Sequence, residues 1–392
     1  MFLHALQKQN PALIEETIKL LENGIILPDT YVIDVDQFKE NALQLKKEAD
    51  KLGIKLYAMT KQFGRNPYLA KLLVNELHYA GIVCVDFKEA RQLHAHGVKI
   101  AHVGHLVQPP KGMIKHLIEE IQPDVITVYS IEKAAEISKA AQHAQRTQRV
   151  LLKFLNPDDQ LYINQESGFD IADIKAVLKT ISTMPNLLIE GLTHFPCFLF
   201  DPATQTTQPT QNLRSLLQAN EKGKALGYNF NQLNSPSSTS SETLPLIKEF
   251  GCTHGEPGHA LTGTTPANQT GNQPEKVAMA YVTEVSHHFN NNSYCYGGGY
   301  YRRGLLDSAL LRETDNNGTR DTITKVTNDD DSSIDYHLKL HHHCAIGTPV
   351  VMAFRTQVFV TRSDVALVKG ISTQSPTLIG LYDALGNEVK NG

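Results

Sequence analysis

Four short segments carry side chains that can do chemistry, and each of them directly follows or closes an apolar run. Lys61 offers an amine, and His194 offers an imidazole. Asn234-Ser235 offers an amide and a hydroxyl, and the segment from Gly255 to His259 offers a carboxylate, an imidazole and two glycines. A single lysine at the end of a strand is ordinarily a solvated surface residue, so no segment alone indicates a function. Together they indicate one only if the fold brings them to one place.

These side chains are the groups that a pyridoxal phosphate site needs. In such a site a lysine forms a Schiff base with the cofactor, and a carboxylate holds the pyridine nitrogen protonated, so that the ring accepts electrons from a substrate carbanion. We therefore expect Lys61 to form the Schiff base and Glu256 to face the pyridine nitrogen. Glycine lets backbone N–H groups approach the phosphate, Ser235 adds a hydroxyl donor, and His194 is expected to stack on the ring.

The elements that must position these residues follow a regular alternation of strand and helix. Eight apolar runs are typical of strands, at residues 54–60, 79–85, 100–106, 124–129, 150–155, 187–194, 230–235 and 252–256. Strict alternation implies a parallel sheet, because each return in the same direction needs a crossover. Eight units over roughly two hundred residues predict an α/β fold, a closed (β/α)8 barrel of the TIM type, with a doubly wound open sheet as the alternative. In a closed barrel the first strand neighbours the eighth, so the four segments converge on one mouth.

The rest of the chain predicts a second domain, because 392 residues exceed the length at which a single core stops growing. Residues 264–275 are rich in Thr, Pro, Asn, Gln and Gly, as linkers are, and the apolar runs beyond them have a strand-like composition. We therefore assign residues 36–262 to the barrel, and residues 1–35 plus 263–392 to a C-terminal β-rich domain.

Four local features carry further expectations. Asp36 stands where an N-cap is needed, ahead of the amphipathic residues 38–52. The acidic residues 312–335 predict an exposed loop or insertion. The polar residues 198–211 follow the sixth strand and are expected to lie over the mouth as a lid. Residues 358–361 are predicted to form a strand.

Composition and charge exclude several classes of function. The formal net charge of -4 and the lack of a basic stripe argue against nucleic acid as a partner. No apolar run approaches membrane-spanning length, and the N-terminus has no signal-peptide cleavage site, so no membrane partner is expected. The five cysteines are widely spaced and form no CxxC pair, which is typical of reduced thiols in a cytoplasmic protein.

Histidines outside the four segments favour structural roles. In the cluster His341-His-His-Cys344, neighbouring residues of a strand would point to opposite faces, so only His342 and Cys344 could share a metal, and no third ligand is evident. We expect a solvated loop there and no metal. His102 and His105, on the third strand, are expected to be core or rim residues rather than catalysts.

The chain resembles the fold-type III pyridoxal phosphate enzymes, the superfamily of alanine racemase and the basic amino-acid decarboxylases, and it is most similar to the YhfX-like amino-acid racemases. Lys61 matches the Schiff-base lysine, Thr193-His194-Phe195 matches the racemase THF motif, and Asn234-Ser235 matches its phosphate-contacting Asn-Ser. Glu256-Pro-Gly-His259 is similar to the decarboxylase EPGR motif, which implies that Glu256 pairs with the pyridine nitrogen and that Gly258 contributes to phosphate binding. His259 stands where decarboxylases carry Arg. The resemblance covers about residues 31–304 and the β-rich tail.

The resemblance also implies a second base. Residues 295–302 are similar to the GYADGYPR-like segment of racemases, whose tyrosine is donated across a dimer interface, and Tyr296 takes the matching position. A phenol needs a neighbouring cation to lower its pKa before it can act as a base. Cys295 is the alternative, because a thiol needs a smaller shift.

The chain departs from the racemase pattern in two places. Alanine racemases place an Arg against the pyridine nitrogen, where this chain has Glu256. The Arg that racemases carry after a Gly-Met pair is missing, because Gly168-Phe169 is followed by Asp170, and the partner of the substrate carboxylate is therefore open.

The resemblance implies a pyridoxal phosphate-dependent amino-acid racemase that exchanges the α-proton between two bases, through an aldimine and a quinonoid. Lys61 would act on one face and Tyr296 on the other. A decarboxylase of the same fold is the alternative, although the tail lacks the Cys-Asp motif of those enzymes. A non-catalytic pyridoxal phosphate-binding protein is the third interpretation. A homodimer is expected, because another surface must cover the barrel mouth to exclude water.

Overall fold

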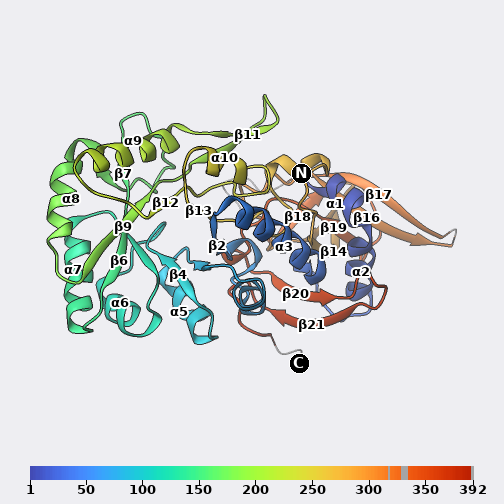
Figure 1. The fold of residues 1–392 in the computed structure, drawn as a ribbon. Helices are drawn as coiled ribbons and strands as arrows, with labels where there is room; N and C mark the ends of the chain where they lie inside the picture. The colour runs from blue at the N-terminus through green and yellow to red at the C-terminus, as the bar shows by residue number, and fades with distance from the viewer. Residues whose placement is uncertain (317, 328–333, 390–392) are drawn as a thin grey trace. The chain divides into compact units, whose positions relative to one another are not determined.

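The structure is a computed structural model that describes residues 1–316, 318–327 and 334–389. The chain forms two compact units, which are described separately. The barrel unit comprises Leu43–Thr60 and Pro67–Gly258, and the sheet unit comprises Met1–Ala42, Lys61–Asn66 and His259–Gly392. Figure 1 shows the ribbon coloured from the N-terminus to the C-terminus.

The barrel unit contains the predicted closed barrel of eight parallel strands. The strands are β2 (Lys55–Met59), β3 (Gly81–Val83), β4 (Ile100–Val103), β5 (Val125–Val128), β6 (Gln148–Leu152), β9 (Leu187–Thr193), β12 (Gln232–Asn234) and β13 (His254–Gly255). They follow one another around the barrel in this order, and β13 pairs with β2 to close it, which excludes the open sheet. Strands β3, β4 and β5 are buried along their whole length, as expected of strands covered on both faces.

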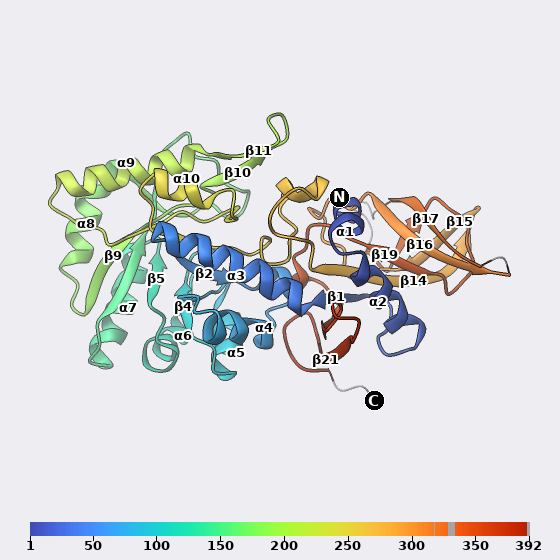
Figure 2. The ribbon, with the colours of Figure 1, turned by 45° about the vertical axis from the view of Figure 1, so that its right-hand side comes forward.

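Helices connect the barrel strands and cover their outer face. They are α4 (Pro67–Lys71), α5 (Phe87–Ala95), α6 (Lys111–His116), α7 (Ile131–His143), α8 (Ile174–Ser182), α9 (Gln211–Ala225) and α10 (Leu244–Glu249). Helix α5 begins at a cap in which the Asp86 side chain accepts from two backbone N–H groups, and Ser130 caps α7 in the same way through one N–H group. Figure 2 shows α7, α8 and α9 on the outer side of the strands.

The sheet unit is built on a nine-stranded sheet, as predicted for the C-terminal β-rich domain. Its strands, in sheet order, are β15 (Asn292–Tyr296), β18 (His337–Leu340), β17 (Gly318–Thr327), β16 (Ser308–Asp315), β19 (Pro349–Met352), β14 (Met279–Phe289), β1 (Thr30–Asp34), β20 (Asp364–Lys369) and β21 (Thr377–Tyr382). All pairs are antiparallel except β1 with β20. Helices α1 (Leu3–Gln9) and α2 (Pro11–Glu22) pack their apolar side chains against this sheet and form a hydrophobic core with it.

The structure corrects four local predictions. Helix α3 (Val35–Leu52) is capped by Asp34, whose Oδ1 accepts from the N–H groups of residues 36 and 37 at 3.1 Å, and not by Asp36. Residues 312–315 and 318–327 belong to the paired strands β16 and β17 instead of a loop, and Arg312 on β16 forms ion pairs with Asp321 on β17 and with Glu15 on α2. Residues 328–333 of the acidic stretch lie outside the described residues.

Residues 198–211 are more ordered than a polar lid loop, because β10 (Phe198–Asp201) and β11 (Thr206–Pro209) pair as a hairpin. Residues 358–360 form a single 3₁₀ turn where a strand was predicted. In the described part of the chain, no helix combines the length and the apolar character that crossing a membrane requires.

Candidate active site

Glu256 directly follows β13, and its segment is fixed to the end of β2. The N–H of Met59, the last residue of β2, donates to the carbonyl of Pro257 at 2.9 Å, and the N–H of Glu256 donates to Oγ1 of Thr239 at 2.9 Å. Lys61 follows Met59 by two residues in the sequence. The closing strand pair of the barrel therefore sets the predicted carboxylate beside the strand from which the predicted lysine continues.

Side chains from two other strands contact the Glu256 carboxylate, and a residue of a third strand contacts one of them. Nδ1 of His102, on β4, lies 2.9 Å from Oε1, and Nδ2 of Asn234, on β12, donates to the same oxygen at 2.8 Å. Nε2 of His105 lies 4.0 Å from Oε2. The second ring nitrogen of His102 lies 2.7 Å from Oγ1 of Thr127, on β5. All five side chains are buried, and together they form what we call the mouth cluster.

The mouth cluster keeps Glu256 ionised. Burial acts to raise the pKa of this carboxyl group, but the attraction of His105 and the hydrogen bonds from His102 and Asn234 outweigh it and lower the pKa of Glu256 to about 2. Oε2 is buried, and among the described residues it accepts no hydrogen bond. A buried anionic oxygen that still lacks a donor matches the protonated ring nitrogen of pyridoxal phosphate. The residues present therefore fit this cofactor.

The backbone after β12 has the conformation expected of a ligand-binding turn. Ser235 is fully buried, and its N–H donates to the carbonyl of His254 at 3.2 Å, which ties the start of the turn to β13. Ser237 and Ser238 have φ values of 92° and 54°, which residues other than glycine seldom adopt and which are concentrated at ligand sites. Gly258 is buried at the end of the barrel unit. These features favour the predicted phosphate contacts of Ser235 and Gly258.

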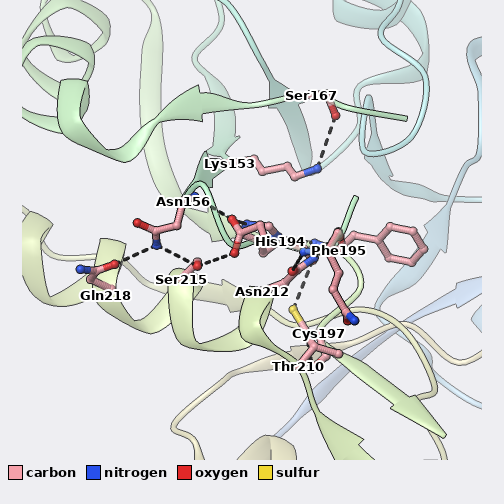
Figure 3. Close-up of polar contacts among 12 residues, drawn as sticks. Lys153, Asn156, Ser167, His194, Phe195, Cys197, Thr210, Asn212, Ser215 and Gln218 are labelled. Atoms are coloured by element: carbon pink, nitrogen blue, oxygen red, sulfur yellow. Dashed lines mark hydrogen bonds and ion pairs between the residues drawn. The ribbon is translucent and has the colours of Figure 1, made fainter. Parts of the chain in front are cut away.

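His194 is held in one tautomer and in one orientation. The N–H of Phe195 donates to Nδ1 at 2.9 Å, so Nε2 carries the proton and donates to Oδ2 of Asp159 at 2.9 Å. Asp159 also accepts from the N–H of Asn156 at 2.7 Å and from Oγ of Ser215 at 2.5 Å. Burial lowers the pKa of His194, so the ring is neutral despite its acidic partner. Figure 3 shows this network together with Lys153.

Lys153, the residue between β6 and β7 (Phe154–Leu155), is a buried cation. Only 3% of the residue is exposed. Its Nζ lies 3.4 Å from Oγ of Ser167 (Figure 3). The ring centroid of Tyr129, the residue after β5, lies 5.8 Å from Nζ. Burial lowers the pKa of Lys153 to about 8, with Cys197 and Asp159 acting in the opposite direction.

Lys61 and His259 both belong to the sheet unit. Lys61 begins a 3₁₀ turn (Lys61–Phe63), which is held by a 2.9 Å hydrogen bond from Oγ1 of Thr356 to the carbonyl of Gln62. Nε2 of His259 accepts from Nε of Arg355 at 3.2 Å. Burial, then the charges of Arg355 and Lys61, lower the pKa of His259 well below its usual range. His259 can therefore form hydrogen bonds but supplies no positive charge of its own.

Tyr296 and Cys295 differ sharply in exposure within the sheet unit. Tyr296 ends β15 and is 41% exposed, with its ring centroid 6.1 Å from that of His337. Cys295 is fully buried, and burial raises the pKa of its thiol to about 12. A thiol in this state is a poor base, so the exposed phenol is the better candidate of the two.

The histidine cluster is partly engaged by its own neighbours. Nε2 of His342 lies 3.3 Å from both carboxylate oxygens of Glu313, and Cys344 is buried with its sulfur 3.6 Å from Oγ of Ser293. Among the described residues, no three metal-ligating side chains gather at one point. The expectation that no metal binds there stays a prediction.

Three of the residues that shape the mouth were not assigned roles from the sequence. His102 was expected to be structural, yet it contacts Glu256 directly. Asp159 lies in a loop without a recognisable motif, and its role emerges only from its contact with His194. Lys153 did carry a signal, because a charged residue interrupts the apolar run of residues 150–155.

Comparison with known families matches both parts of the chain. Residues 33–266 match the alanine racemase N-terminal domain, and residues 280–378 match the YhfX-like C-terminal domain. The chain is 51% identical over 389 residues to the uncharacterized protein YhfX of Escherichia coli (strain K12). The aligned region covers 99% of this chain and 100% of that protein.

Solved structures with the same fold include enzymes of several activities. D-threonine aldolase from Filomicrobium marinum has a TM-score of 0.67 at 14% identity, with 91% of this chain and 94% of that chain covered. Alanine racemase of Clostridium difficile 630, in complex with cycloserine, has a TM-score of 0.62 at 13% identity, with 92% and 99% covered. D-threo-3-hydroxyaspartate dehydratase from Delftia sp. HT23 has a TM-score of 0.63 at 15% identity, with 89% and 95% covered. The solved structures share the fold, whereas the family match and the 51% identical relative go further: the chain belongs to the alanine racemase family of fold-type III enzymes and, within it, to the YhfX-like group.

Proposed function

We propose that this protein is a pyridoxal phosphate-dependent amino-acid racemase. Pyridoxal phosphate is the cofactor of the family to which the chain belongs. When bound, the cofactor supplies an electron sink for the charge left on the α-carbon after proton removal. The chain must supply the groups that hold the ring, move the proton and exclude water.

The observation that carries this proposal is the unsatisfied oxygen of Glu256. Its Oε2 is buried without a hydrogen-bond donor among the described residues, and the pKa of Glu256 is lowered to about 2. Burying an ionised carboxylate away from water raises the free energy of the folded protein unless a donor completes the hydrogen bonds of the carboxylate. A protonated pyridine nitrogen is such a donor. We assign Glu256 to the ring nitrogen, Ser235 and Gly258 to the phosphate, and His194 to a ring face.

The proton would be exchanged between two groups of the chain. Lys61 takes the α-proton on one face, and Tyr296 returns a proton to the opposite face, so that the net composition of the amino acid is unchanged. The partial exposure of Tyr296 and the buried state of Cys295 support the choice of the tyrosine. His259 is assigned as a neutral hydrogen-bonding group near Lys61.

The proposal includes a homodimer, in which Tyr296 of one copy serves the barrel of the other. A carbanion must be protected from water, and the open end of a barrel needs a cover to exclude it. We also propose a cytoplasmic location, which the five reduced and buried cysteines support.

A decarboxylase remains the second candidate because an ionised Glu256 favours reactions that place full negative charge on the α-carbon. The aldolase and dehydratase activities of the fold relatives add two further reactions that begin on the same kind of site. A non-catalytic pyridoxal phosphate-binding protein is the remaining interpretation.

Incubation of the purified protein and cofactor with single enantiomers of the amino acids separates these activities. We expect the opposite enantiomer to appear on chiral chromatography in the same amount as the starting enantiomer disappears. Release of carbon dioxide, an aldehyde, or ammonia with a keto acid would assign decarboxylation, aldol cleavage or dehydration instead. Cofactor binding without any of these would leave a binding protein.

Two measurements link the activity to the assigned residues. Borohydride treatment of the protein with cofactor should bleach the visible absorption band, and the modified peptide should contain Lys61. Tyr296→Phe should abolish racemisation with little effect on cofactor binding, whereas Tyr294→Phe, in the same strand, serves as the matched control. A borohydride label on any other lysine would contradict the assignment of Lys61.

A further inference from the structure

Lys153 is a buried cation that forms no ion pair with any described residue. Among the described residues, no carboxylate oxygen lies within 4.0 Å of its Nζ, and the contacts of Nζ are the hydroxyl of Ser167 at 3.4 Å and the ring of Tyr129 at 5.8 Å. The residue is 3% exposed, so water offers little solvation in exchange. A buried cation in this state is costly unless a ligand supplies the counter-charge.

The carboxylates of Asp159 and Glu256 already have other hydrogen-bond donors. Asp159 accepts from His194, Asn156 and Ser215. Glu256 forms hydrogen bonds with His102 and Asn234. It follows β13, which lies three strands away from β6 around the barrel, whereas Lys153 follows β6. Neither carboxylate can turn to Lys153 without leaving buried donors unsatisfied.

The position of Lys153 also limits what the counter-charge can be. In the closed barrel, β6 lies opposite β2, the strand that continues into Lys61. Under the proposed function the ring nitrogen faces Glu256, directly after β13, and the phosphate faces the turn after β12. The anionic group that has no assigned partner is the carboxylate of the amino-acid substrate.

We propose that Lys153 binds the α-carboxylate of the substrate. This inference rests on the proposed function, because it concerns an amino acid bound to the same barrel mouth. A single ammonium beside an aromatic ring matches one carboxylate, which can accept from Nζ; Oγ of Ser167 already donates to the carbonyl of Gln165 at 3.2 Å. The site would therefore select α-amino acids over amines that lack the carboxylate.

The test compares amino acids with the amines derived from them. The protein with bound cofactor is titrated with the twenty common amino acids in both configurations, and the dissociation constant is read from the change in the visible absorption band. The amino acid with the strongest response is then compared with its decarboxylated amine. Three proteins are measured: wild type, Lys153→Met and Lys153→Arg, with circular dichroism as a check on folding.

We expect Lys153→Met to weaken binding of the amino acid by about ten- to a hundredfold, as the loss of a charged hydrogen bond should. Binding of the amine and of pyridoxal phosphate should stay at the wild-type level, and Lys153→Arg should retain part of the affinity for the amino acid. Lys99→Met is the matched control, because Lys99 is exposed and precedes β4 at the other end of the barrel.

Unchanged amino-acid binding in Lys153→Met would overturn the inference and leave the proposed function intact. Weaker binding of pyridoxal phosphate in this variant would also overturn it, because the ammonium would then face the cofactor. If Lys153→Met does not fold, Lys153→Arg provides the test. The ratio of its affinity for the amino acid to its affinity for the amine is compared with the wild-type ratio, and an unchanged ratio rejects the inference. A wild-type protein that binds cofactor and responds to no amino acid would contradict the proposed function itself, and this inference with it.

Discussion

Nδ1 of His102 lies 2.9 Å from Oε1 of Glu256, although 154 positions separate the two residues in the sequence and two strands separate them around the barrel. The contact therefore spans the interior of the mouth instead of following a pair of neighbouring strands. Because His102 also contacts Thr127, its ring is fixed at both nitrogens and fixes one carboxylate oxygen in turn. The other carboxylate oxygen, Oε2, accepts no hydrogen bond from the described residues.

Glu256→Gln tests the role of this carboxylate. The amide keeps the shape of the side chain but removes the charge, so we expect weaker binding of pyridoxal phosphate and a fall in kcat of about 100-fold or more. Fluorescence titration with the cofactor and steady-state kinetics measure the two effects. Glu132→Gln, at an exposed position of α7, should behave as wild type. A Glu256→Gln protein with full affinity and activity would remove the basis of the assignment.

His102→Asn tests the stability that the mouth cluster contributes. The shorter side chain cannot reach both Glu256 and Thr127, so at least one buried polar group loses its partner. We expect the free energy of unfolding to fall by about 1–3 kcal/mol in urea denaturation. His143→Asn, whose side chain is 81% exposed, should change stability little. An equal free energy of unfolding for His102→Asn and His143→Asn would show that the mouth cluster rearranges without loss of stability.

His254 should make the protein less stable as the pH falls. Burial, then the charges of Lys55 and His102, lower the pKa of His254 from 6.5 to about 3. As the pH falls below about 6.5, His254 is protonated in the unfolded chain but stays neutral in the folded protein. The stability present above that pH is therefore lost as the pH falls towards about 3.

Urea denaturation between about pH 8 and about pH 5 measures this loss, because Glu256 titrates below that range. His254→Gln should show a smaller loss than wild type over the same interval, since glutamine does not titrate. An identical pH dependence in the two proteins would mean that other buried histidines carry the effect.

Gly191→Ala should damage the barrel itself. Gly191 pairs with Gln232 between β9 and β12, and a Cβ at this position would lie 1.8 Å from the Gln232 carbonyl oxygen. The backbone must shift to relieve this clash, so we expect a loss of about 3 kcal/mol or more. Thermal melting of Gly112→Ala gives the control, because a Cβ there meets nothing within 4 Å and alanine favours the helix α6. The two variants should thus move the melting temperature in opposite directions.

The barrel could be predicted because its signals are local. Each strand is an apolar run of a few residues bounded by turn residues or a helix, and counting such runs was enough to give eight strands and their order. The position of Glu256 at the end of the closing strand follows from the same count. The N-cap was predicted two residues too late, since Asp34 and Asp36 are equally good caps in sequence and only the observed backbone distinguishes them.

The sequence by itself determined the alternation of strands and helices, the barrel, the β-rich tail and the family. Only the tertiary structure decided which polar groups meet inside the mouth: His102 contacts Glu256, Asp159 contacts His194, and among the described residues no carboxylate oxygen lies within 4.0 Å of Nζ of Lys153. The physical reason is that apolar periodicity depends on neighbours in the chain, whereas a buried hydrogen bond or an uncompensated charge depends on distances across the barrel between residues far apart in sequence.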